Sequence, residues 1–355
     1  MSFSTKTVRQ PEPAAATGTL ISRRVSSSNH TWNLVLVGAV LVLGILLPFL
    51  LPAAELGVAM RILIFALMGV GWNMMSGFGG MFSFGHAAFF GIGAYTTAFL
   101  LVEVGMTPWI GMIVGMIVSA AAAVGISYLA LRYQLRGAYY ALSTFAFAEM
   151  LRLFVMGNES LNKTIGFTVP VMFGDNWGMF QFRAGSPVYF WIGTAMLVIV
   201  MLFCIWFLRS RAGRFSIATR DDELAASAIG IPTLRYKLTL VAISAAITAL
   251  AGALYLQFYM FIDPDLAFGA TVSNNAIITA VVGGVGTLWG PVLGAVIVAP
   301  LSDLVTELLR HPPEWLGFLE GLDGLDILVY AVVLIAFVLL LPKGIVGTFL
   351  GRRKK

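Results

Sequence analysis

Ten apolar runs follow one another along this chain, and each is about as long as a helix that crosses a membrane. Such a helix needs about 20 mostly apolar residues. The runs cover residues 33–53, 58–77, 82–102, 109–131, 138–157, 188–208, 237–260, 269–286, 289–307 and 326–342. Hydrophobic residues make up 59% of the chain and charged residues 11%, against about 45–50% and 25% in soluble domains. This composition excludes a soluble enzyme, a disordered chain and a disulfide scaffold, so the sequence predicts an all-α polytopic membrane protein.

Three of these runs have glycines at their ends. Glycine-rich backbone at membrane depth is tolerated where neighbouring protein covers it. We therefore expect short or broken helices in runs 82–102, 269–286 and 289–307. The glycines concerned are Gly79, Gly80, Gly85, Gly283, Gly284, Gly286 and Gly290.

The two ends of the chain are polar. Residues 1–32 are rich in Ser, Thr, Ala and Pro, and residues 348–355 end in a basic cluster. We expect a flexible cytoplasmic tail over 1–32, a transmembrane domain over 33–347, and a basic cytoplasmic tail over 348–355.

The Lys and Arg residues predict the orientation, because basic residues accumulate in cytoplasmic loops. If the N-terminus is cytoplasmic and the chain crosses the membrane ten times, 17 of the 22 basic residues lie on the cytoplasmic side and Arg152 lies within a run. Only four lie on the outer side of the membrane: Arg61, Lys163, Arg183 and Arg310. Both termini are then cytoplasmic. Spans 2–5 begin outside and spans 7–10 begin inside, which is the parity of an inverted repeat; the repeat is a possibility without a clear sequence match.

Sequence patterns for enzymatic chemistry are absent. The chain has no G-x-x-x-x-G-K-[ST] phosphate loop, no HExxH and no CxxC. The stretch 284–290 resembles a dinucleotide fingerprint, but its spacing is wrong and no strand precedes it. We expect no catalytic residues, no metal site and no nucleic-acid partner. Transport or channel function is the natural class, with a self-sufficient channel or secondary carrier and a membrane-embedded enzyme as the alternatives.

The long loop 209–237 between two spans contains the pattern of a short helix over 220–229. Thr219 and Asp222 fit a capping box at its start. The acidic residues in the first turn are stabilised by the helix dipole, whose positive end lies at the helix N-terminus. Gly230, followed by Pro232, ends the helix. The loop is expected to lie on the cytoplasmic side.

One face of this expected helix is apolar and carries Leu224, Ala225, Ala228 and Ile229. Two interpretations fit such a face: a helix lying on lipid, or a docking helix for a cytoplasmic subunit. The acidic start favours docking, because anionic lipid attracts basic residues.

Several polar or small residues occur at membrane depth, where polar groups indicate function by default. Ser83, His86, Phe90 and Gly93 have the spacing of one helix face and could line a solute route. Hydrogen bonding and close helix packing are the alternative roles. Asn73 has the same two interpretations. A further polar cluster early in the eighth run consists of Ser273, Asn274 and Asn275.

Glu149 and Arg152 lie three residues apart in the fifth run. Residues at this spacing share a helix face, so the two charges can neutralise each other. We expect an intramembrane ion pair, with a direct role in solute binding as the alternative. The pairs Gly111/Gly115 and Gly290/Gly294 have the spacing of helix-packing surfaces.

Four motifs together resemble one family. They are Asn73-x-x-x-Gly77-x-x-Gly80-x-x-Ser83-x-Gly85-His86 with its continuation to Tyr95, Arg209 to Arg214 with Arg220-Asp-Asp-Glu-Leu-Ala-Ala-Ser-Ala-Ile-Gly230 and Tyr236-Lys-Leu, Gly283-Gly-Val-Gly286-Thr-Leu-Trp-Gly290-Pro-Val-Leu-Gly294, and Leu341-Pro-Lys-Gly344. The chain is similar in these motifs to the LivM-type permeases of ABC importers for branched-chain amino acids.

The resemblance implies a ten-span permease of the bacterial inner membrane. Its implied partners are a LivH-like second permease, two cytoplasmic ATPase subunits that bind the ATP, and an extracytoplasmic substrate-binding protein. The permease itself would need no cofactor. The loop helix would insert into the ATPase, which implies coupling roles for Arg220, Asp221, Asp222, Glu223, Leu224, Ala225, Ala228, Ile229 and Gly230.

The chain departs from the family at two places. It has Asn158-Glu-Ser-Leu-Asn-Lys-Thr-Ile-Gly166-Phe where members often carry T-G-G-[ST], and it has no acidic residue near Asn275. The solute implied is a branched-chain or other hydrophobic amino acid. Another small polar solute, such as urea or another amide, is the alternative within the same class of transporter.

Overall fold

The computed structural model describes residues 30–171, 174–183, 185–310 and 344–347. The long helices are α1 (His30–Leu50), α2 (Ala53–Trp72), α3 (His86–Val102), α4 (Pro108–Arg132), α5 (Ala138–Gly157), α6 (Val188–Arg209), α9 (Thr233–Tyr259) and α12 (Gly290–Arg310). The shorter elements are the π-helix η1 (Asn73–Gly77), the 3₁₀-helix η2 (Glu159–Leu161), α7 (Arg211–Asp221), α8 (Glu223–Ala228), α10 (Pro264–Phe268), α11 (Ala270–Gly283), and the strands β1 (Phe167–Thr168) and β2 (Phe261–Ile262).

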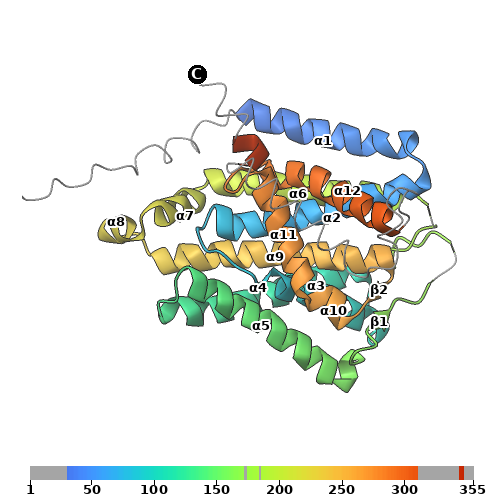
Figure 1. The fold of residues 1–355 in the computed structure, drawn as a ribbon, viewed down its shortest axis with the longest axis horizontal. Coiled ribbons are helices and arrows are strands. Elements are labelled where there is room, and N and C mark those ends of the chain that lie inside the picture. Colours follow the sequence, from blue (N-terminus) through green and yellow to red (C-terminus); the bar gives the residue numbers. More distant parts are fainter. Residues whose placement is uncertain (1–29, 172–173, 184, 311–343, 348–355) are drawn as a thin grey trace, which may run out of the picture.

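Most of the long helices run side by side along one axis of the molecule, and α7 and α8 lie at one end of it (Figure 1). We call this the α8 end. At the opposite end, β1 and β2 pair as an antiparallel ribbon in which Phe167 lies opposite Ile262. We call this the ribbon end. The ribbon joins the loop after α5 to the segment after α9, although about a hundred residues of sequence separate them.

The described helices confirm an all-α polytopic membrane protein. Seven segments are long and apolar enough to cross a membrane, by length and composition: Thr31–Leu50, Glu55–Gly77, Pro108–Arg132, Ala138–Gly157, Val188–Arg209, Thr233–Tyr259 and Pro264–Gly283. Two shorter apolar helices, His86–Val102 and Gly290–Leu304, correspond to the third and ninth runs. The tenth run, 326–342, the tail 348–355 and residues 1–29 of the first tail lie outside the described residues. The inverted repeat and the domain limits therefore stay predictions.

Two of the three runs with flanking glycines form short helices, α3 with 17 residues and α11 with 14, whereas the ninth run forms the long helix α12. The third run begins four residues later than expected, because irregular backbone follows η1 and α3 starts only at His86. The eighth run forms the short helix α11, and Gly269, with a ψ of 150°, separates it from the short helix α10 that precedes the run. Gly284, with a φ of +125°, ends α11, since few residues other than glycine adopt that conformation.

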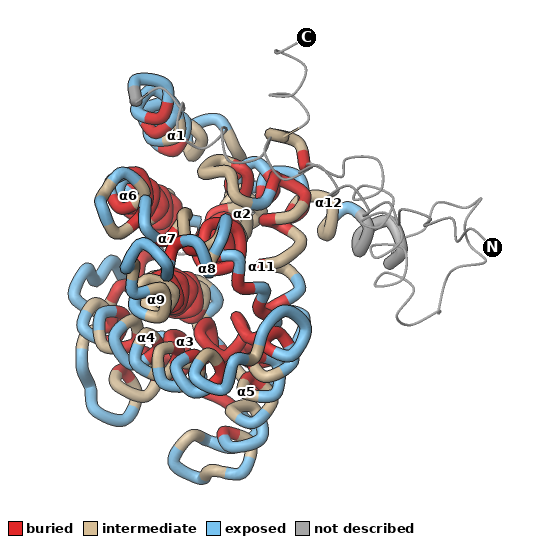
Figure 2. The backbone as a smooth tube through the Cα atoms, turned by 90° about the vertical axis from the view of Figure 1, so that its left-hand side faces the viewer, coloured by how far each residue is buried: buried red, intermediate tan, exposed pale blue. Residues whose placement is uncertain are grey.

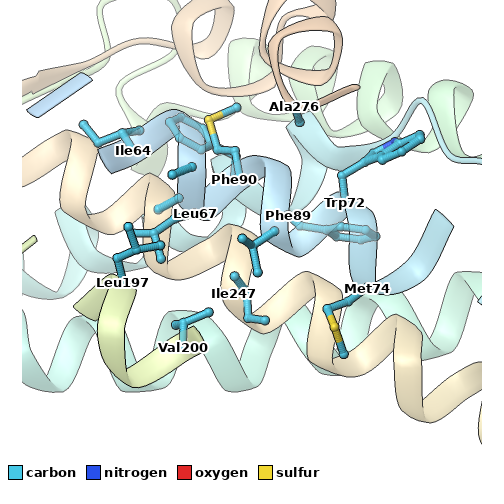
Figure 3. Close-up of a cluster of buried hydrophobic side chains, with 14 of the residues drawn as sticks. Ile64, Leu67, Trp72, Met74, Phe89, Phe90, Leu197, Val200, Ile247 and Ala276 are labelled. Atoms are coloured by element: carbon cyan, nitrogen blue, oxygen red, sulfur yellow. The ribbon is translucent and has the colours of Figure 1, made fainter. Parts of the chain in front are cut away.

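Helix α9 is the centre of the bundle and packs against α2, α3 and α4 (Figure 2). Small residues on α9 allow this, because Ala245, Ala249 and Ala253 are fully buried. Figure 3 shows larger side chains filling the space between neighbouring helices: Ile64, Leu67 and Trp72 from α2, Phe89 and Phe90 from α3, Leu197 and Val200 from α6, and Ile247 from α9.

Glycines set the distance between α3, α4 and α9. A Cβ atom on Gly93 of α3 would lie 2.1 Å from the carbonyl oxygen of Ala249, and one on Gly252 of α9 would lie 2.1 Å from that of Phe90. A Cβ on Gly115 would lie 3.1 Å from the carbonyl oxygen of Gly93. The helix backbones are therefore in direct contact, as expected for small residues at interfaces between transmembrane helices.

The two GxxxG pairs are packing surfaces, as predicted. A Cβ on Gly111 would lie 3.0 Å from the Thr97 Cα, and one on Gly294 would lie 1.9 Å from the Thr279 carbonyl oxygen. The outer faces of the helices carry large exposed aliphatic side chains instead, such as Ile117 of α4 and Ile199 of α6. Apolar residues on the outside of a bundle are what a lipid environment requires.

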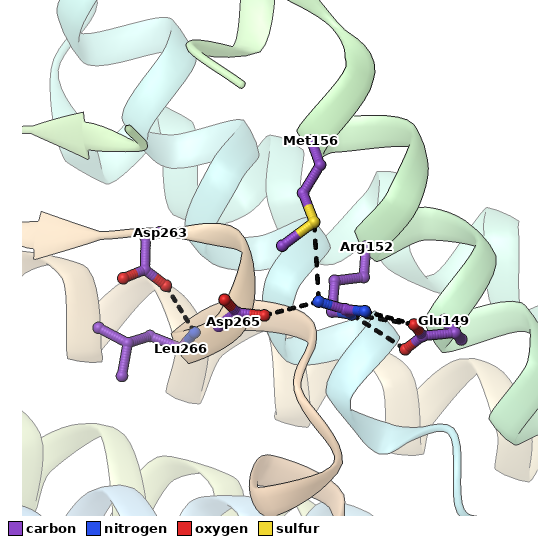
Figure 4. Close-up of polar contacts among 6 residues, drawn as sticks. All are labelled: Glu149, Arg152, Met156, Asp263, Asp265 and Leu266. Atoms are coloured by element: carbon purple, nitrogen blue, oxygen red, sulfur yellow. Dashed lines mark hydrogen bonds and ion pairs between the residues drawn. The ribbon is translucent and has the colours of Figure 1, made fainter. Parts of the chain in front are cut away.

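A cluster of three charges joins α5 to α10 towards the ribbon end (Figure 4). Arg152 donates from Nε to the two carboxylate oxygens of Glu149 at 3.1 and 3.0 Å, and its second terminal nitrogen reaches Glu149 at 2.5 Å. Its remaining nitrogen donates to Asp265 at 2.7 Å. The expected partner of Arg152 is thus present, and Asp265 is a second partner that sequence spacing did not indicate.

A second charged contact joins α2 to α12, where Arg61 donates to Asp303. Both side chains are about one quarter to two fifths exposed. Both are charged residues within apolar runs, which is the sequence signal that could have indicated the pair. Helix spacing could not predict the pair, because 242 residues of sequence separate the two side chains.

We predict that Arg152→Gln destabilises the protein more than Glu149→Gln, because it leaves two carboxylates facing each other while Glu149→Gln leaves Arg152 paired with Asp265. A hydrogen bond to a charged group contributes about 1.5–3 kcal/mol, and the partial exposure of Glu149 and Asp265 places the effect at the lower end of this range. The measurement is the Tm of the purified protein in detergent.

The double variant Arg152→Gln with Glu149→Gln should regain part of the loss, which a double-mutant cycle measures. Arg183→Gln, on the exposed loop after α5, is the matched control and should leave the Tm unchanged. Equal losses for Arg152→Gln and Glu149→Gln would show that Asp265 contributes nothing.

Candidate functional site

The loop between α6 and α9 folds differently from the prediction of one helix over 220–229. Helix α7 continues through Asp221, and a separate helix α8 begins at Glu223. Thr219 does not cap it, because its hydroxyl donates to the Phe215 carbonyl inside α7. Asp222 is the cap instead: its backbone is extended (φ −153°, ψ 107°) and its carboxylate accepts from the Ala225 N–H at 2.9 Å. Arg220 and Asp221 consequently belong to α7.

The end of α8 is as the sequence predicted. Gly230 has a φ of +83°, its N–H donates to the Ser227 carbonyl, and the Ile231 N–H donates to the Ala226 carbonyl. This pair of bonds is the Schellman motif, in which glycine occupies the left-handed position. Two defined ends make α8 a short element of fixed length and direction.

The apolar face of α8 points away from the protein. Leu224 is 76% exposed and Ile229 is 78% exposed, and Ala225 and Ala228 are exposed beside them. Ala226 is the buried residue of α8. Leu224 on α8 and Ile229 at its C-cap thus present apolar side chains that the described part of the chain leaves exposed.

Glu223, the first residue of α8, connects this helix to the bundle. Its carboxylate lies 2.7 Å from the Lys237 ammonium at the start of α9 and 3.6 Å from the Arg136 guanidinium, just before α5. Lys237 is only 14% exposed, so this pair is well shielded from water, whereas Arg136 is 65% exposed. This ion pair therefore ties the start of α8 to α9.

Arg220, the last but one residue of α7, makes the second connection. One terminal nitrogen donates to the Gly77 carbonyl at the end of η1, at 3.0 Å. Asp221 holds the other side of the guanidinium, with distances of 3.0 and 2.7 Å from one carboxylate oxygen. The side chain crosses over Gly80, where a Cβ would lie 2.8 Å from the Arg220 Cγ.

A cavity of about 220 Å³ lies between these two connections at the α8 end. Its wall combines charged residues of the α7–α8 junction with residues of the η1–α3 segment and of the turn before α5. The residues that form it include Gly80, Phe82, Arg136, Tyr140, Arg220 and Lys237.

Asn73 lies in the first position of η1 and is buried. Its amide nitrogen donates to the Thr287 carbonyl at 2.8 Å, and its amide oxygen accepts from the Gly286 N–H at 2.8 Å. One side chain thus holds the backbone between α11 and α12 at two points. Of the two interpretations that the sequence allowed for Asn73, these contacts correspond to hydrogen bonding within the bundle.

The set Ser83, His86, Phe90 and Gly93 does not form one helix face, because α3 begins at His86 and Ser83 precedes it. His86 Nε2 lies 2.9 Å from the Ser244 hydroxyl, which itself donates to the Gly71 carbonyl. Phe90 packs edge-on against Tyr255. The helical members of the set therefore contact α9, and they form a packing surface in this chain.

Ser273, Asn274 and Asn275 differ in their surroundings. The Ser273 hydroxyl is buried and accepts from the Ala87 N–H at 2.9 Å. Asn274 is exposed and Asn275 is half-buried, and neither amide has a hydrogen-bond partner among the described residues. Only the two asparagines of this cluster have polar groups available for another molecule.

Sequence reasoning missed several polar residues inside the bundle. Gln257 of α9 is fully buried, and neither of its amide atoms has a partner within the described part of the chain. A glutamine inside an apolar run was the available signal. Among the described residues, no three His, Cys, Asp or Glu side chains gather where they could hold a metal ion, and Cys204 is a buried free thiol.

Comparison with known proteins agrees with this architecture. Residues 55–322 match the family model described as "Branched-chain amino acid transport system / permease component". The high-affinity branched-chain amino acid transport system permease protein LivM of Salmonella typhimurium is 29% identical over 302 residues, which cover 79% of this chain and 70% of LivM.

Two further relatives show the breadth of the similarity. LivH, another permease protein of the Escherichia coli high-affinity branched-chain amino acid system, is 27% identical over 80% of this chain and 91% of its own length. The fructose import permease protein FrcC of Rhizobium meliloti is 32% identical over 42% of this chain and 41% of FrcC. No solved structure matches the chain significantly. Since the family model covers most of the chain, the protein belongs to the family of permease components of branched-chain amino acid transport systems.

Proposed function

We propose that this permease carries branched-chain or other hydrophobic amino acids inward as part of a binding-protein-dependent ABC importer. The similarity to LivM and LivH over about four fifths of the chain supports this solute class. In the proposed assembly the chain pairs with a LivH-like second permease in the bacterial inner membrane. Two ATPase subunits bind on the cytoplasmic side, and an extracytoplasmic protein delivers the amino acid.

The exposed apolar face of α8 is the observation that supports the ATPase contact. Leu224 and Ile229 project from the end of the bundle opposite the ribbon, on a helix with two defined ends. Docking against a cytoplasmic subunit would remove both side chains from water, at a gain of about 1.5–3 kcal/mol for each residue fully buried. The basic residues around the loop support a cytoplasmic location of this end, because basic residues accumulate in cytoplasmic loops.

The partner subunits supply the energy in this proposal. This chain has no phosphate-binding loop, so ATP would bind to the ATPase subunits and the permease would have no ATPase site of its own. The mechanical step of this chain is the movement of its helices when α8 moves.

Asn274 and Asn275 are the proposed solute-facing residues. Their amides are free among the described residues, whereas Asn73, Ser83, His86, Phe90, Gly93 and Ser273 are engaged in contacts within the bundle. An amide can bind either the ammonium or the carboxylate of an amino acid, because it has both donors and acceptors.

We predict that Leu224→Asp expels the ATPase, because the substitution places an unpaired charge in the proposed contact and burying such a charge costs several kcal/mol. The measurement is co-purification of the ATPase with the permease, together with solute-stimulated ATP hydrolysis in liposomes. Leu224→Met is the matched control, since it keeps an apolar side chain of similar volume and should retain both activities. Wild-type binding by Leu224→Asp would refute the docking role of α8.

We also predict the orientation of the chain. In a variant whose buried Cys204 is replaced by Ser, a cysteine at Ser160 should react with a membrane-impermeant thiol reagent from outside. A cysteine at Ser227 of α8 should react only after the membrane is opened. Both positions are exposed in the structure, so access to the reagent depends on the side of the membrane. Labelling of both from the same side would overturn the proposed topology.

A further inference from the structure

Three segments that are far apart in the sequence meet at the α8 end around one hydrogen bond. They are the end of α7, the end of η1, and the backbone between α11 and α12. The Arg220 guanidinium donates to the Gly77 carbonyl at 3.0 Å. A Cβ on Gly286 would lie 3.3 Å from the same carbonyl oxygen and 3.5 Å from the donating nitrogen of Arg220. We call the meeting point of Arg220, Gly77, Asn73 and Gly286 the junction.

The junction depends on the π-helical turn of η1. In this turn the Phe78 N–H bonds to the Asn73 carbonyl five residues back. A single π-helical turn inside or at the end of an α-helix is frequently found at functional sites. Gly77 has no side chain, and a Cβ there would lie 2.0 Å from the Asn73 amide oxygen and 2.7 Å from the Gly286 nitrogen. This close packing brings the Gly77 carbonyl within reach of Arg220.

Asn73 extends the junction to α11 and α12. Its two hydrogen bonds to Gly286 and Thr287 hold the connection between these helices. Movement of the Arg220 side chain therefore acts on η1 directly and on the α11–α12 connection through Asn73. The helices concerned, α2, α11 and α12, also pack on one another.

The break at Asp222 separates this junction from the other connection of the loop. Arg220 lies before the break and holds α2, while Glu223 lies after it and holds α9 through Lys237. The two residues are thus attached to different elements, η1 at the end of α2 and the start of α9, which also pack against each other. A displacement of α8 relative to α7 would move the Glu223 attachment on α9 relative to the Arg220 attachment on η1.

We propose that Arg220 is a positioning residue for import, which transmits displacement of the α7–α8 loop through the Gly77 carbonyl and Asn73 to α2, α11 and α12. This inference rests on the proposed function, since it requires that an ATPase moves α8. It goes further in naming the residue and the helices that receive the movement. Asp221 orients the guanidinium, and the η1–α3 glycine Gly80, with a φ of +69°, gives it space to cross.

The test uses the complete transporter in liposomes, with the second permease, the ATPases and the binding protein, and leucine as the solute. For Arg220→Gln we expect normal co-purification of the ATPase and continued ATP hydrolysis. The number of leucine molecules imported per ATP hydrolysed should fall about tenfold, the factor that corresponds to a lost hydrogen bond to a charged group. Arg220→Lys should restore part of this ratio, because its ammonium can still reach the Gly77 carbonyl with one hydrogen bond.

Arg214→Gln is the matched control, because Arg214 lies on the same helix, is exposed, and donates to the carbonyl of its near neighbour Arg209. It should leave the import ratio unchanged. The inference is overturned if Arg220→Gln imports at the wild-type ratio, or if it releases the ATPase, since Arg220 would then be a docking residue. It is also overturned if Arg214→Gln lowers the ratio equally, because loss of any loop charge would then explain the result.

The Leu224→Asp variant separates this inference from the proposed function. If Leu224→Asp releases the ATPase while Arg220→Gln behaves as wild type, the junction alone is refuted. If Leu224→Asp keeps the ATPase and stimulated hydrolysis, the docking role of α8 fails, and the transmission through Arg220 fails with it.

Discussion

Direct backbone contact between α3 and α9 is the constraint on which the rest of the structure depends. Gly93 and Gly252 leave no room for a side chain between the two helices, and Gly115 brings α4 against the same place. Inside a membrane the hydrophobic effect does not press helices together, so close packing and hydrogen bonds must do so. Helix α4 then presents mostly small residues inward and large aliphatic residues to the surroundings.

Much of the fold could be predicted from the sequence, because the residues within each helix determine where that helix forms and ends. Nine apolar runs correspond to described helices, and two of the three runs with flanking glycines form the short helices α3 and α11. The end of α8 at Gly230 also follows from local chemistry, since glycine is favoured at the left-handed position of a Schellman motif.

The remainder could not be predicted because it depends on contacts between distant residues or on a choice between equal local signals. Thr219 and Asp222 are both good helix caps, and the structure uses Asp222 because α7 remains helical through Thr219. Asp265 and Asp303 are partners of arginines 113 and 242 residues away. Ser83 matched a helical spacing but lies before the helix, since the π-helical turn of η1 delays the start of α3.

The central place of α9 has a consequence for how the chain is made. Gly93 and its contact Ala249 are separated by more than 150 residues, and α3 and α4 both precede α9 in the chain. At synthesis rates of about 5–20 residues per second, α9 follows α3 after an interval on the order of ten to thirty seconds. During this time α3 and α4 lie in the bilayer, and the surface around Gly93 that α9 later covers is not yet in contact with α9. The insertion machinery must keep this surface from pairing with other helices, so biogenesis of the permease is most vulnerable before α9 arrives.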